Sequence, residues 1–426
     1  MSNKAPSSVL ADFLKAQKEQ YLKAIEEGKG KEWLVVMGNE AGDLDSLASA
    51  VAYAWYAATI QQIPAVPLIQ TPRPDLHLRS ENLYALELAG IPPADPPLLC
   101  ISDIPSVTPF PSNKFALVDH NRLGSRFTEE NPDAKVVAVI DHHEDEGLYK
   151  DTADPRVITV PTGSASSLVA LHLGEKCADQ VPPELATLIL SAILIDTHGL
   201  KVGGKAEDAD RHAASFLAPH SLLSIEAGVA ESELHSQPAI QEMAKTLDEE
   251  KSSVAHLNTT DLLRRDYKEY TMTPHWQKDK PILIGLASVP VGLKLWTKRD
   301  QAFFTSTEQF MNERKLTVLG VLTSFRDEEK LNKHGKPKHR REQLFVVRKG
   351  EVKGLAKILF KGLEASKELK LKKMDLKNKS KFSFKKHKDF SKEFKARMWK
   401  QKNVDATRKV TAPVVKGVIE GTQEKA

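Results

Sequence analysis

Short apolar runs alternate with longer amphipathic stretches from Trp33 to about Gly199. Most of these runs are rich in β-branched residues and hydrophobic at every position, which is typical of strands buried on both faces of a sheet. Strands that alternate with helices in this way predict βαβ units, and therefore an α/β domain with a doubly wound, mostly parallel sheet. The predicted strands are Trp33–Met37, Ala65–Leu68, Leu98–Ile101, Phe115–Val118, Val136–Ile140 and Val157–Val160.

Other stretches of the first half have the pattern of helices. Residues 1–30 resemble an amphipathic helix, and the alanine-rich stretch after the first strand predicts a helix that starts at Asp45 or Ser46 and ends near Ile60. The apolar run Leu185–Ile195 follows two prolines and is rich in Leu and Ala, so it is predicted to be a buried helix rather than a strand.

The second half has a pattern of its own. A chain of 426 residues is long for one core, because domains usually run to about 100–200 residues. A charged, alanine-rich helical stretch, residues 201–256, is expected to link two domains, which span residues 1–220 and 221–426. The second domain is predicted to be a smaller α/β unit with strands at Tyr267–Thr273, Pro281–Pro290, Leu316–Ser324 and Leu344–Arg348.

The segment Lys367–Lys402 is dense in lysine and partly low in complexity. This segment is expected to be either a solvated loop or a basic surface that lines the binding site. Aromatic rings among basic residues would also suit base stacking in a nucleic-acid binder. The rings interleaved with the lysines are Phe382, Phe384, Phe390 and Phe394.

The cysteine content excludes a disulfide-stapled fold. Only Cys100 and Cys177 are present, which favours a reducing compartment and argues against a structural metal site held by cysteines. The longest apolar stretches are far shorter than the roughly 20 residues that cross a bilayer, and residues 1–21 lack the apolar core of a signal peptide. We therefore expect a cytoplasmic protein that has no membrane partner. A monomer is also expected.

The net charge of +4 conceals an asymmetry between the two halves. Residues 1–220 carry 18 Lys and Arg against 30 Asp and Glu, a net −12, whereas residues 221–426 carry 43 against 27, a net +16. Clustered basic residues attract polyanions and phosphorylated ligands. The second half is therefore expected to bind a polyanion, of which nucleic acid is only one kind.

Acidic and histidine side chains follow four apolar runs of the first half. Because doubly wound sheets bind ligands at the carboxyl ends of their strands, we expect these side chains to share one crevice. A single Asp at a helix start is most often a cap, but four such groups at successive element ends favour a common site. The candidates are Asp43, Asp45, Asp119, His142, His143 and Asp196.

So many like charges are stable together only when cations neutralise them. Carboxylate oxygens and imidazole nitrogens, without thiolates, suit divalent ions such as Mg²⁺ or Mn²⁺. Two such ions can clamp the attacking and leaving oxygens of a phosphoryl displacement and lower the pKa of a bridging water. The pattern therefore predicts a phosphohydrolase site with two divalent ions.

The same motifs resemble those of the DHH phosphoesterase superfamily, and within it the branch shared by type II inorganic pyrophosphatases and fungal-type exopolyphosphatases. In the basic half, Asp266-Tyr267-Lys268 is similar to the element that opens the family's second domain, and Thr407-Arg408-Lys409 is similar to its C-terminal signature, with Thr in place of Ser. The four motifs of the first half are matched in order by Asp43-Leu44-Asp45-Ser46, Asp119-His120-Asn121, Asp141-His142-His143 and Asp196-Thr197.

The resemblance implies a role for each matched residue. His143 would face the phosphate and donate a proton to the leaving oxygen, and Asp141 would orient an imidazole without binding metal. Asp119 would bridge two ions. The other implied metal ligands are Asp43, Asp45, His142 and Asp196, and the implied phosphate ligands are Lys268, Arg408 and Lys409.

Asn39 separates the two subfamilies of this branch. Type II pyrophosphatases have a His four residues before the first Asp of the D-x-D motif, and this chain has Asn39 there. An amide binds transition metals less well than an imidazole, so we expect Mg²⁺ to be favoured over a strict Mn²⁺ dependence. Asn is the exopolyphosphatase-like choice, and Asn39 is counted with Asp119 and His143 among the candidate catalytic residues.

A basic insertion, Lys333–Arg341, lies between predicted strands of the second domain. A chain of phosphates needs a charged track beyond the active site, and Arg340 and Arg341 of this insertion are the candidate residues for it. A solvated basic loop without such a role is the alternative.

Together these features predict an exopolyphosphatase that cuts the terminal phosphate from inorganic polyphosphate, in a cleft between an acidic metal domain and a basic substrate domain. No nucleic acid is required. The alternatives are a type II-like inorganic pyrophosphatase, an oligonucleotide exonuclease of the same superfamily, and a non-catalytic binder of polyphosphate or RNA.

Overall fold

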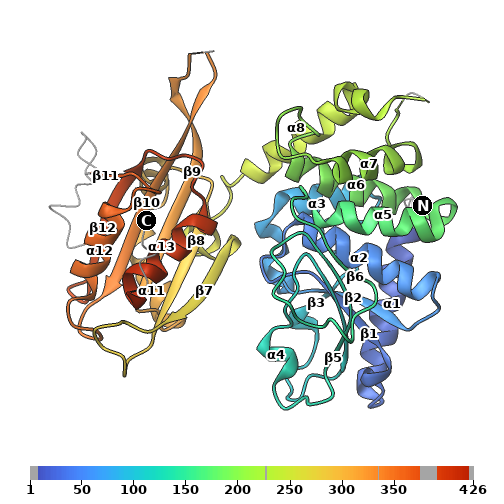
Figure 1. Cartoon of the computed structure of the whole chain (residues 1–426), viewed down its shortest axis with the longest axis horizontal. Helices are drawn as coiled ribbons and strands as arrows, with labels where there is room; N and C mark the ends of the chain where they lie inside the picture. Colours follow the sequence, from blue (N-terminus) through green and yellow to red (C-terminus); the bar gives the residue numbers. More distant parts are fainter. Residues whose placement is uncertain (1–7, 226–227, 334, 375–390, 422–426) are drawn as a thin grey trace, which may run out of the picture. The chain divides into compact units, whose positions relative to one another are not determined.

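The computed structural model describes residues 8–225, 228–333, 335–374 and 391–421. The chain divides into two compact units, Met1–Ser253 and Val254–Ala426, and each has a six-stranded sheet and a core of its own (Figure 1). The α/β class expected from the sequence is confirmed.

The sheet of the first unit has the strand order β3-β2-β1-β4-β5-β6. Every pairing of neighbouring strands is parallel, which confirms the doubly wound arrangement. The order reverses between β1 and β4, and such a switch point is where doubly wound sheets bind their ligands. The strands are β1 (Leu34–Met37), β2 (Ala65–Ile69), β3 (Leu99–Cys100), β4 (Lys114–Val118), β5 (Lys135–Asp141) and β6 (Arg156–Ile158).

The continuous hydrophobicity of these strands follows from burial on both faces. In β1, Leu34 and Val36 belong to one buried cluster, whereas Val35 and Met37 belong to another on the opposite face. The helices that supply these clusters and their neighbours are α1 (Val9–Glu26), α2 (Leu44–Thr59), α3 (Ser80–Leu88), α4 (Ser125–Thr128), α5 (Ala165–Cys177), α6 (Pro183–Thr197), α7 (Asp208–Leu217) and α8 (Pro238–Ser252).

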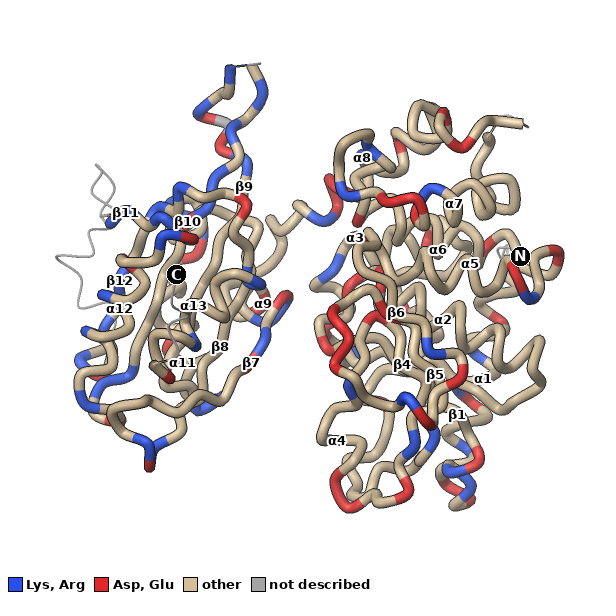
Figure 2. The backbone as a smooth tube through the Cα atoms, viewed as in Figure 1, with Lys and Arg blue, Asp and Glu red and all other residues tan. Residues whose placement is uncertain are grey.

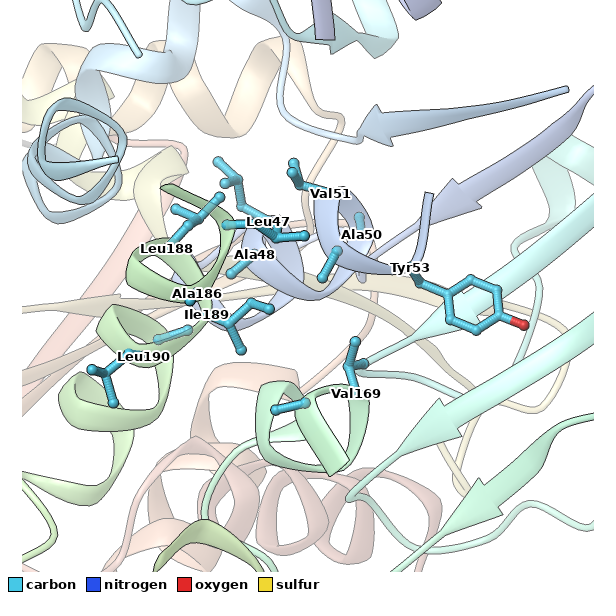
Figure 3. Close-up of a cluster of buried hydrophobic side chains, with 14 of the residues drawn as sticks. Leu47, Ala48, Ala50, Val51, Tyr53, Val169, Ala186, Leu188, Ile189 and Leu190 are labelled. Atoms are coloured by element: carbon cyan, nitrogen blue, oxygen red, sulfur yellow. The ribbon is translucent and has the colours of Figure 1, made fainter. Parts of the chain in front are cut away.

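Helix α2 is buried along nearly all of its length. Its alanines let α5 and α6 pack closely against it, as Figure 3 shows for Ala48 and Ala50 of α2, Val169 of α5 and Leu188 of α6. The expected helix at 185–195 is confirmed as α6. Helix α2 starts at Leu44, one residue before the earlier of the two expected starts, because the Asp43 side chain caps the helix by accepting from the Ser46 backbone N–H at 3.1 Å.

The stretch 201–256 packs on the first unit. Ala213 and Leu217 of α7 and Met243 and Leu247 of α8 are buried in the core of that unit. The division between the units therefore falls after Ser253 rather than at residue 220. The charged residues that suggested a linker lie on the outer sides of amphipathic helices.

The sheet of the second unit has the order β11-β12-β10-β9-β8-β7. Only β8 and β9 pair in parallel, and the other pairings are antiparallel. Its strands are β7 (Tyr267–Met272), β8 (Ile282–Val289), β9 (Val318–Leu331), β10 (Pro337–Arg348), β11 (Leu371–Lys373) and β12 (Phe394–Gln401). Its helices are α9 (Thr259–Arg265), α10 (Leu293–Arg299), α11 (Phe303–Glu313), α12 (Leu355–Ala365) and α13 (Arg408–Glu420).

Most of the basic insertion is strand rather than loop. Pairing of β9 with β10 continues from Val318 opposite Val347 to Leu331 opposite Pro337, so the insertion forms the end of a long hairpin (Figure 1). The hydrophobic pattern could not predict this extension, because both faces of the hairpin's outer part are polar and a strand without a buried face has no apolar alternation.

The lysine-rich segment is only partly described. Phe394 is buried in β12, which makes it a core residue and removes it from the candidates for base stacking. Phe382, Phe384 and Phe390 lie outside the described residues. None of the described helices is long and apolar enough to cross a membrane.

Replacing Asp103 by asparagine is expected to destabilise the first unit by about 1–2 kcal/mol at neutral pH. Asp103 accepts from the Arg73 guanidinium at 2.7 and 3.0 Å and lies 2.9 Å from the Lys18 ammonium. Although partial burial opposes ionisation, these cations and the Cys100 backbone N–H lower the pKa of Asp103 to about 2. Because the folded-state pKa is depressed, this stability is present above the ordinary value of 3.8 and is lost as pH falls toward about 2.

Urea denaturation of the wild type and Asp103→Asn at neutral and at acid pH measures this difference. The control is Asp95→Asn, because Asp95 also pairs with Arg73, at 3.1 Å, but its side chain is 89% exposed. The control should cost less than about 0.5 kcal/mol. A difference between wild type and Asp103→Asn that stays constant down to the lowest pH would contradict the electrostatic explanation.

Candidate metal centre

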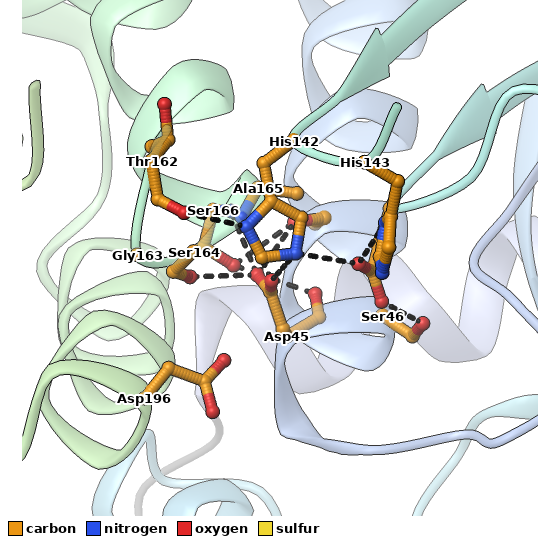
Figure 4. A network of polar contacts seen from close by, with 12 residues as sticks. Asp45, Ser46, His142, His143, Thr162, Gly163, Ser164, Ala165, Ser166 and Asp196 are labelled. Atoms are coloured by element: carbon orange, nitrogen blue, oxygen red, sulfur yellow. Dashed lines mark hydrogen bonds and ion pairs between the residues drawn. The ribbon is translucent and has the colours of Figure 1, made fainter. Parts of the chain in front are cut away.

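The side chains that follow β1, β4 and β5 meet at the carboxyl ends of these strands. Ligand atoms of Asp119, His142 and His143 all lie within 4.8 Å of one another. Asp45, in the first turn of α2, lies 3.8 Å from His142, and Asp196 extends from the last turn of α6 toward the same place (Figure 4). The structure therefore brings together five of the six residues that the sequence analysis selected, and the sixth, Asp43, caps α2 with its Oδ1 two residues before Asp45.

Asp119 is held by one of its carboxylate oxygens. Oδ2 accepts from the Asn39 amide and from the Ser46 hydroxyl, both at 2.6 Å, whereas Oδ1 lies 3.3 Å from Nε2 of His142. The residue has a φ of +60°, which is rare for a residue other than glycine and is found at functional sites. One oxygen is thus satisfied by the protein, and the other is available to a cation.

His142 is oriented as a metal ligand would be. Its Nδ1 lies 3.0 Å from the Thr162 carbonyl oxygen, which can only accept, so Nδ1 carries a hydrogen. In the neutral ring the lone pair is then on Nε2, which faces Oδ1 of Asp119 at 3.3 Å and Oδ2 of Asp45 at 3.8 Å. A hydrogen bond from the second ring nitrogen to a carbonyl is the usual way in which a ligating histidine is fixed.

The side chain of Asp45, which belongs to α2, lies at the N-terminal end of α5. Its carboxylate accepts from the Ser164 hydroxyl at 2.8 Å and from the backbone N–H groups of Ala165 and Ser166, each at 2.7 Å (Figure 4). These donors and the helix dipole stabilise its negative charge although the side chain is only 2% exposed.

The electrostatics of the cluster show that negative charge is in excess. Burial and the neighbouring Asp45 and Asp43 carboxylates raise the pKa of Asp119 well above its usual value. Burial also raises the pKa of Asp196 to about 7, although Lys251, 3.8 Å away, opposes this shift. Burial alone would lower the pKa of His142, but Asp119 and Asp45 raise it to about 10. Carboxylates that resist ionisation beside an imidazole that attracts a proton form a donor set that fits divalent cations.

His143 forms a separate dyad with Asp141. Nδ1 of His143 lies 2.9 Å from Oδ1 of Asp141, which is fully buried. Burial opposes the ionisation of Asp141, but the His143 ring and the Asn121 amide lower its pKa. An ionised Asp141 accepts a hydrogen bond from Nδ1–H, so Nε2 of the partly exposed His143 ring remains free to hold or transfer a proton.

Asn39 donates rather than ligates. Its amide nitrogen reaches Oδ2 of Asp119 at 2.6 Å, and its amide oxygen accepts from the Ala41 backbone N–H at 2.8 Å. Both ends of the side chain are therefore used in fixing the loop after β1 and the orientation of Asp119. Asn39 is a positioning residue in this arrangement.

The basic candidate residues all belong to the second unit. Arg408, the first residue of α13, donates to the Asp266 backbone oxygen at 2.9 Å and lies 2.8 Å from its carboxylate. Lys268, on β7, and Lys409, in the first turn of α13, are exposed. Arg340 and Arg341 are consecutive residues of β10.

Sequence analysis missed Asp210, a fully buried carboxylate that supports the centre from α7. It accepts from the backbone N–H groups of Gly163 and Ser164 and from the Ser167 hydroxyl at 2.6 Å. It thereby fixes the loop whose Thr162 carbonyl holds His142 and whose next residues hold Asp45. The signal was hidden because Asp210 lies in a charged stretch in which an acid is most often solvated.

Comparison with known proteins identifies two family models. Residues 33–193 match the DHH family, N-terminal domain, and residues 245–418 match the DHHA2 domain. A Schizosaccharomyces pombe protein named "Putative exopolyphosphatase" is 32% identical over 338 residues, which cover 75% of this chain and 81% of that protein. A Deinococcus radiodurans protein named "Probable manganese-dependent inorganic pyrophosphatase" is 29% identical over 237 residues, which cover 56% of this chain and 65% of that protein.

A solved structure shares the fold. The crystal structure of a Methanococcus jannaschii protein, described as a "putative family II inorganic pyrophosphatase", matches with a TM-score of 0.56 and 18% identity. The match covers 91% of this chain and all of that one. At this identity the likeness concerns the fold alone.

Proposed function

The chain belongs to the DHH family, in the branch with a DHHA2 domain, and is a hydrolase of phosphoanhydride bonds; from this premise we propose that it is an exopolyphosphatase, releasing terminal phosphate from inorganic polyphosphate. The observation that supports the proposal is a cluster of carboxylates and imidazoles at one sheet edge, in which His143 is also hydrogen-bonded to the buried Asp141 carboxylate. The Schizosaccharomyces relative, which bears the exopolyphosphatase name, supports the choice of substrate.

In this proposal five residues hold divalent ions, of which two are expected, and Mg²⁺ or Mn²⁺ fits their oxygen and nitrogen donors. Such ions lower the pKa of a bound water and neutralise charge on a transferring phosphoryl group. Asn39 and Ser46 keep Oδ1 of Asp119 toward the ions, and the Thr162 carbonyl does the same for Nε2 of His142. The five ligands are Asp43, Asp45, Asp119, His142 and Asp196.

His143 is the proposed proton donor to the leaving oxygen. The Nδ1–H group donates a hydrogen bond to the Asp141 carboxylate, so the proton that can be transferred is on Nε2. In the second unit, Lys268, Arg408 and Lys409 are the proposed ligands of the terminal phosphates, and the Arg408 guanidinium is oriented for this by Asp266.

A pyrophosphatase is the second candidate, and the Deinococcus relative favours it. Asn39 speaks against it, because the resemblance to type II pyrophosphatases calls for a metal-binding histidine at this position. An asparagine whose amide oxygen is already bonded to Ala41 adds no ligand to the first metal site.

The test is phosphate release with Mg²⁺ or Mn²⁺ from long polyphosphate, pyrophosphate and a short single-stranded RNA at equal phosphate concentration. We expect release from polyphosphate to exceed release from the other two substrates by about tenfold or more, which corresponds to about 1.4 kcal/mol of discrimination. Chelation of the metal should abolish it.

Each other outcome identifies a different enzyme. Faster release from pyrophosphate would establish the pyrophosphatase and show that Asn39 does not decide the substrate. Faster release of nucleotides from RNA would establish an exonuclease. If metal is bound and no product is released from any of the three substrates, the protein would be a non-catalytic binder of polyphosphate or RNA.

A further inference from the structure

Alternation along β10 sends two adjacent arginines to opposite faces of the sheet. Arg340 lies on the face that also carries Glu342, and its guanidinium is 2.5 Å from the Asp327 carboxylate. Arg341 lies on the face of Gln343, which bonds to Thr411 of α13. Nε of Arg341 donates to the Val404 carbonyl oxygen, which holds the side chain beside the start of α13 without neutralising it.

Two more basic side chains share the face of Arg341. The strand register places Arg326 of β9 opposite His339 of β10, and Ser324 opposite Arg341. Nε2 of His339 is 2.9 Å from the Ser324 hydroxyl, which confirms that these side chains lie on one face. Figure 2 shows Lys and Arg positions along this hairpin, with acidic positions among them.

Among the side chains that the structure describes here, two arginines and a histidine face one carboxylate. Burial, together with Arg341 and Arg326, lowers the pKa of His339, and burial lowers the pKa of Arg341. The carboxylate that acts on both is Asp405, which is exposed. Arg340, by contrast, has two acids beside it on its own face.

Helix α13 adds to the same potential. It is 13 residues long, Thr407 caps it, and its first turn contains no acidic residue. The positive end of its dipole begins at Thr407, three residues after Val404, to which Arg341 is bonded. The Arg341 guanidinium and the His339 imidazole lie on one strand face, and the start of α13 follows Val404. Such groups are the elements of an anion site.

We propose that Arg326, His339 and Arg341 bind interior phosphates of the polyphosphate chain, and that Arg340 does not. The inference rests on the proposed function and adds a binding site beyond the terminal phosphates. Each interior phosphate has two non-bridging oxygens, which match the two terminal nitrogens of a guanidinium. The site therefore selects chains with several phosphates over short ones.

The two arginines provide a matched pair for the test. Arg341→Gln and Arg340→Gln remove the same charge at adjacent positions, so long-range electrostatics change equally. For long polyphosphate, Arg341→Gln should raise the KM of the full-length protein about tenfold, the size of one charge-assisted bidentate contact, with kcat unchanged. For tripolyphosphate the KM should change less than about twofold, and Arg340→Gln should change neither KM by more than that.

A conservative variant and a direct binding measurement keep the test independent of folding and of turnover. Arg341→Lys keeps the positive charge but loses the two terminal guanidinium nitrogens, and should raise the KM for long polyphosphate about threefold. Titration of the full-length variants with long polyphosphate should give the same ranking. If the wild type releases no phosphate from polyphosphate, the proposed function fails, and this titration still tests the site.

Several results would overturn the inference. Equal losses in Arg341→Gln and Arg340→Gln would mean unspecific attraction, and an unchanged KM in Arg341→Gln would mean no contact. Equal losses for long and short substrates would place Arg341 at the terminal phosphates. A larger loss in the binding of single-stranded RNA than of polyphosphate would make RNA the ligand of this face.

Discussion

Asp119→Asn is expected to reduce phosphate release roughly 10³-fold, because the variant loses a charged ligand at the centre of the site. Two donors, Asn39 and Ser46, face Oδ2 of Asp119 at 2.6 Å. The amide oxygen of the variant would take that position, which leaves the amide nitrogen facing Nε2 of His142. The amide nitrogen, which carries two hydrogens, cannot bind a cation. The substitution therefore replaces a metal ligand with a group that repels the metal ion.

The fold should survive this change. Burial and the Asp43 and Asp45 carboxylates already disfavour the ionised form of Asp119, so a neutral amide relieves repulsion in the metal-free protein. Thermal unfolding without metal should therefore give a Tm equal to or above that of the wild type, and added Mg²⁺ should raise the Tm of the variant less. The control is Asp133→Asn at an exposed position of the same unit, which should keep full activity. Activity within tenfold of the wild type would contradict the role of Asp119.

The first sheet could be predicted because its strands are buried on both faces. Residues such as Val35 and Val36 face different cores, so both had to be apolar, and the resulting runs are visible without any structure. The outer part of the β9–β10 hairpin lacked this signal, because backbone pairing can continue where no side chain is buried. The division after Ser253 was missed for a related reason, since α7 and α8 are amphipathic and bury only one side.

The candidate site could be predicted as a set of residues but not as an arrangement of atoms. Strand ends converge in a parallel sheet, and this placed Asp119 and His142 together before any distance was known. Which oxygen of Asp119 is free depends on Asn39 and Ser46, and which nitrogen of His142 is free depends on the Thr162 carbonyl. The sequence showed Asn39 and Ser46 beside the motif but not which oxygen they would bind, and the Thr162 carbonyl is a backbone group in a loop, which carries no sequence signal.

The basic residues show the same limit at the scale of one strand. Arg340 and Arg341 look equivalent in a run of charges, and both were candidates for substrate binding. Only the register of β10 shows that one is paired with Asp327 while the other lies beside α13. A lysine- and arginine-rich segment therefore predicts affinity for anions, but the strand face determines which of its residues can contact a ligand.

His143→Ala is expected to lower kcat roughly 10²–10³-fold, with little change in KM, because a proton donor acts on the transition state. Asp141→Asn should cost less, about 10- to 100-fold, which is the usual effect of a residue that orients another. Asparagine offers either an oxygen or a donor to Nδ1, so the tautomer with the hydrogen on Nδ1 is no longer enforced. Steady-state kinetics with long polyphosphate and circular dichroism of both variants measure these effects.

The double variant separates positioning from structure. If Asp141 acts only through His143, adding Asp141→Asn to His143→Ala should lower kcat by no more than about twofold further, so that the two effects are far from additive. A purely structural role of Asp141 would instead multiply the two losses, because its bonds to Asn121 and to the His142 backbone N–H persist without the His143 ring. A multiplied loss would therefore remove the dyad from the proposed mechanism while leaving the metal ligands untouched.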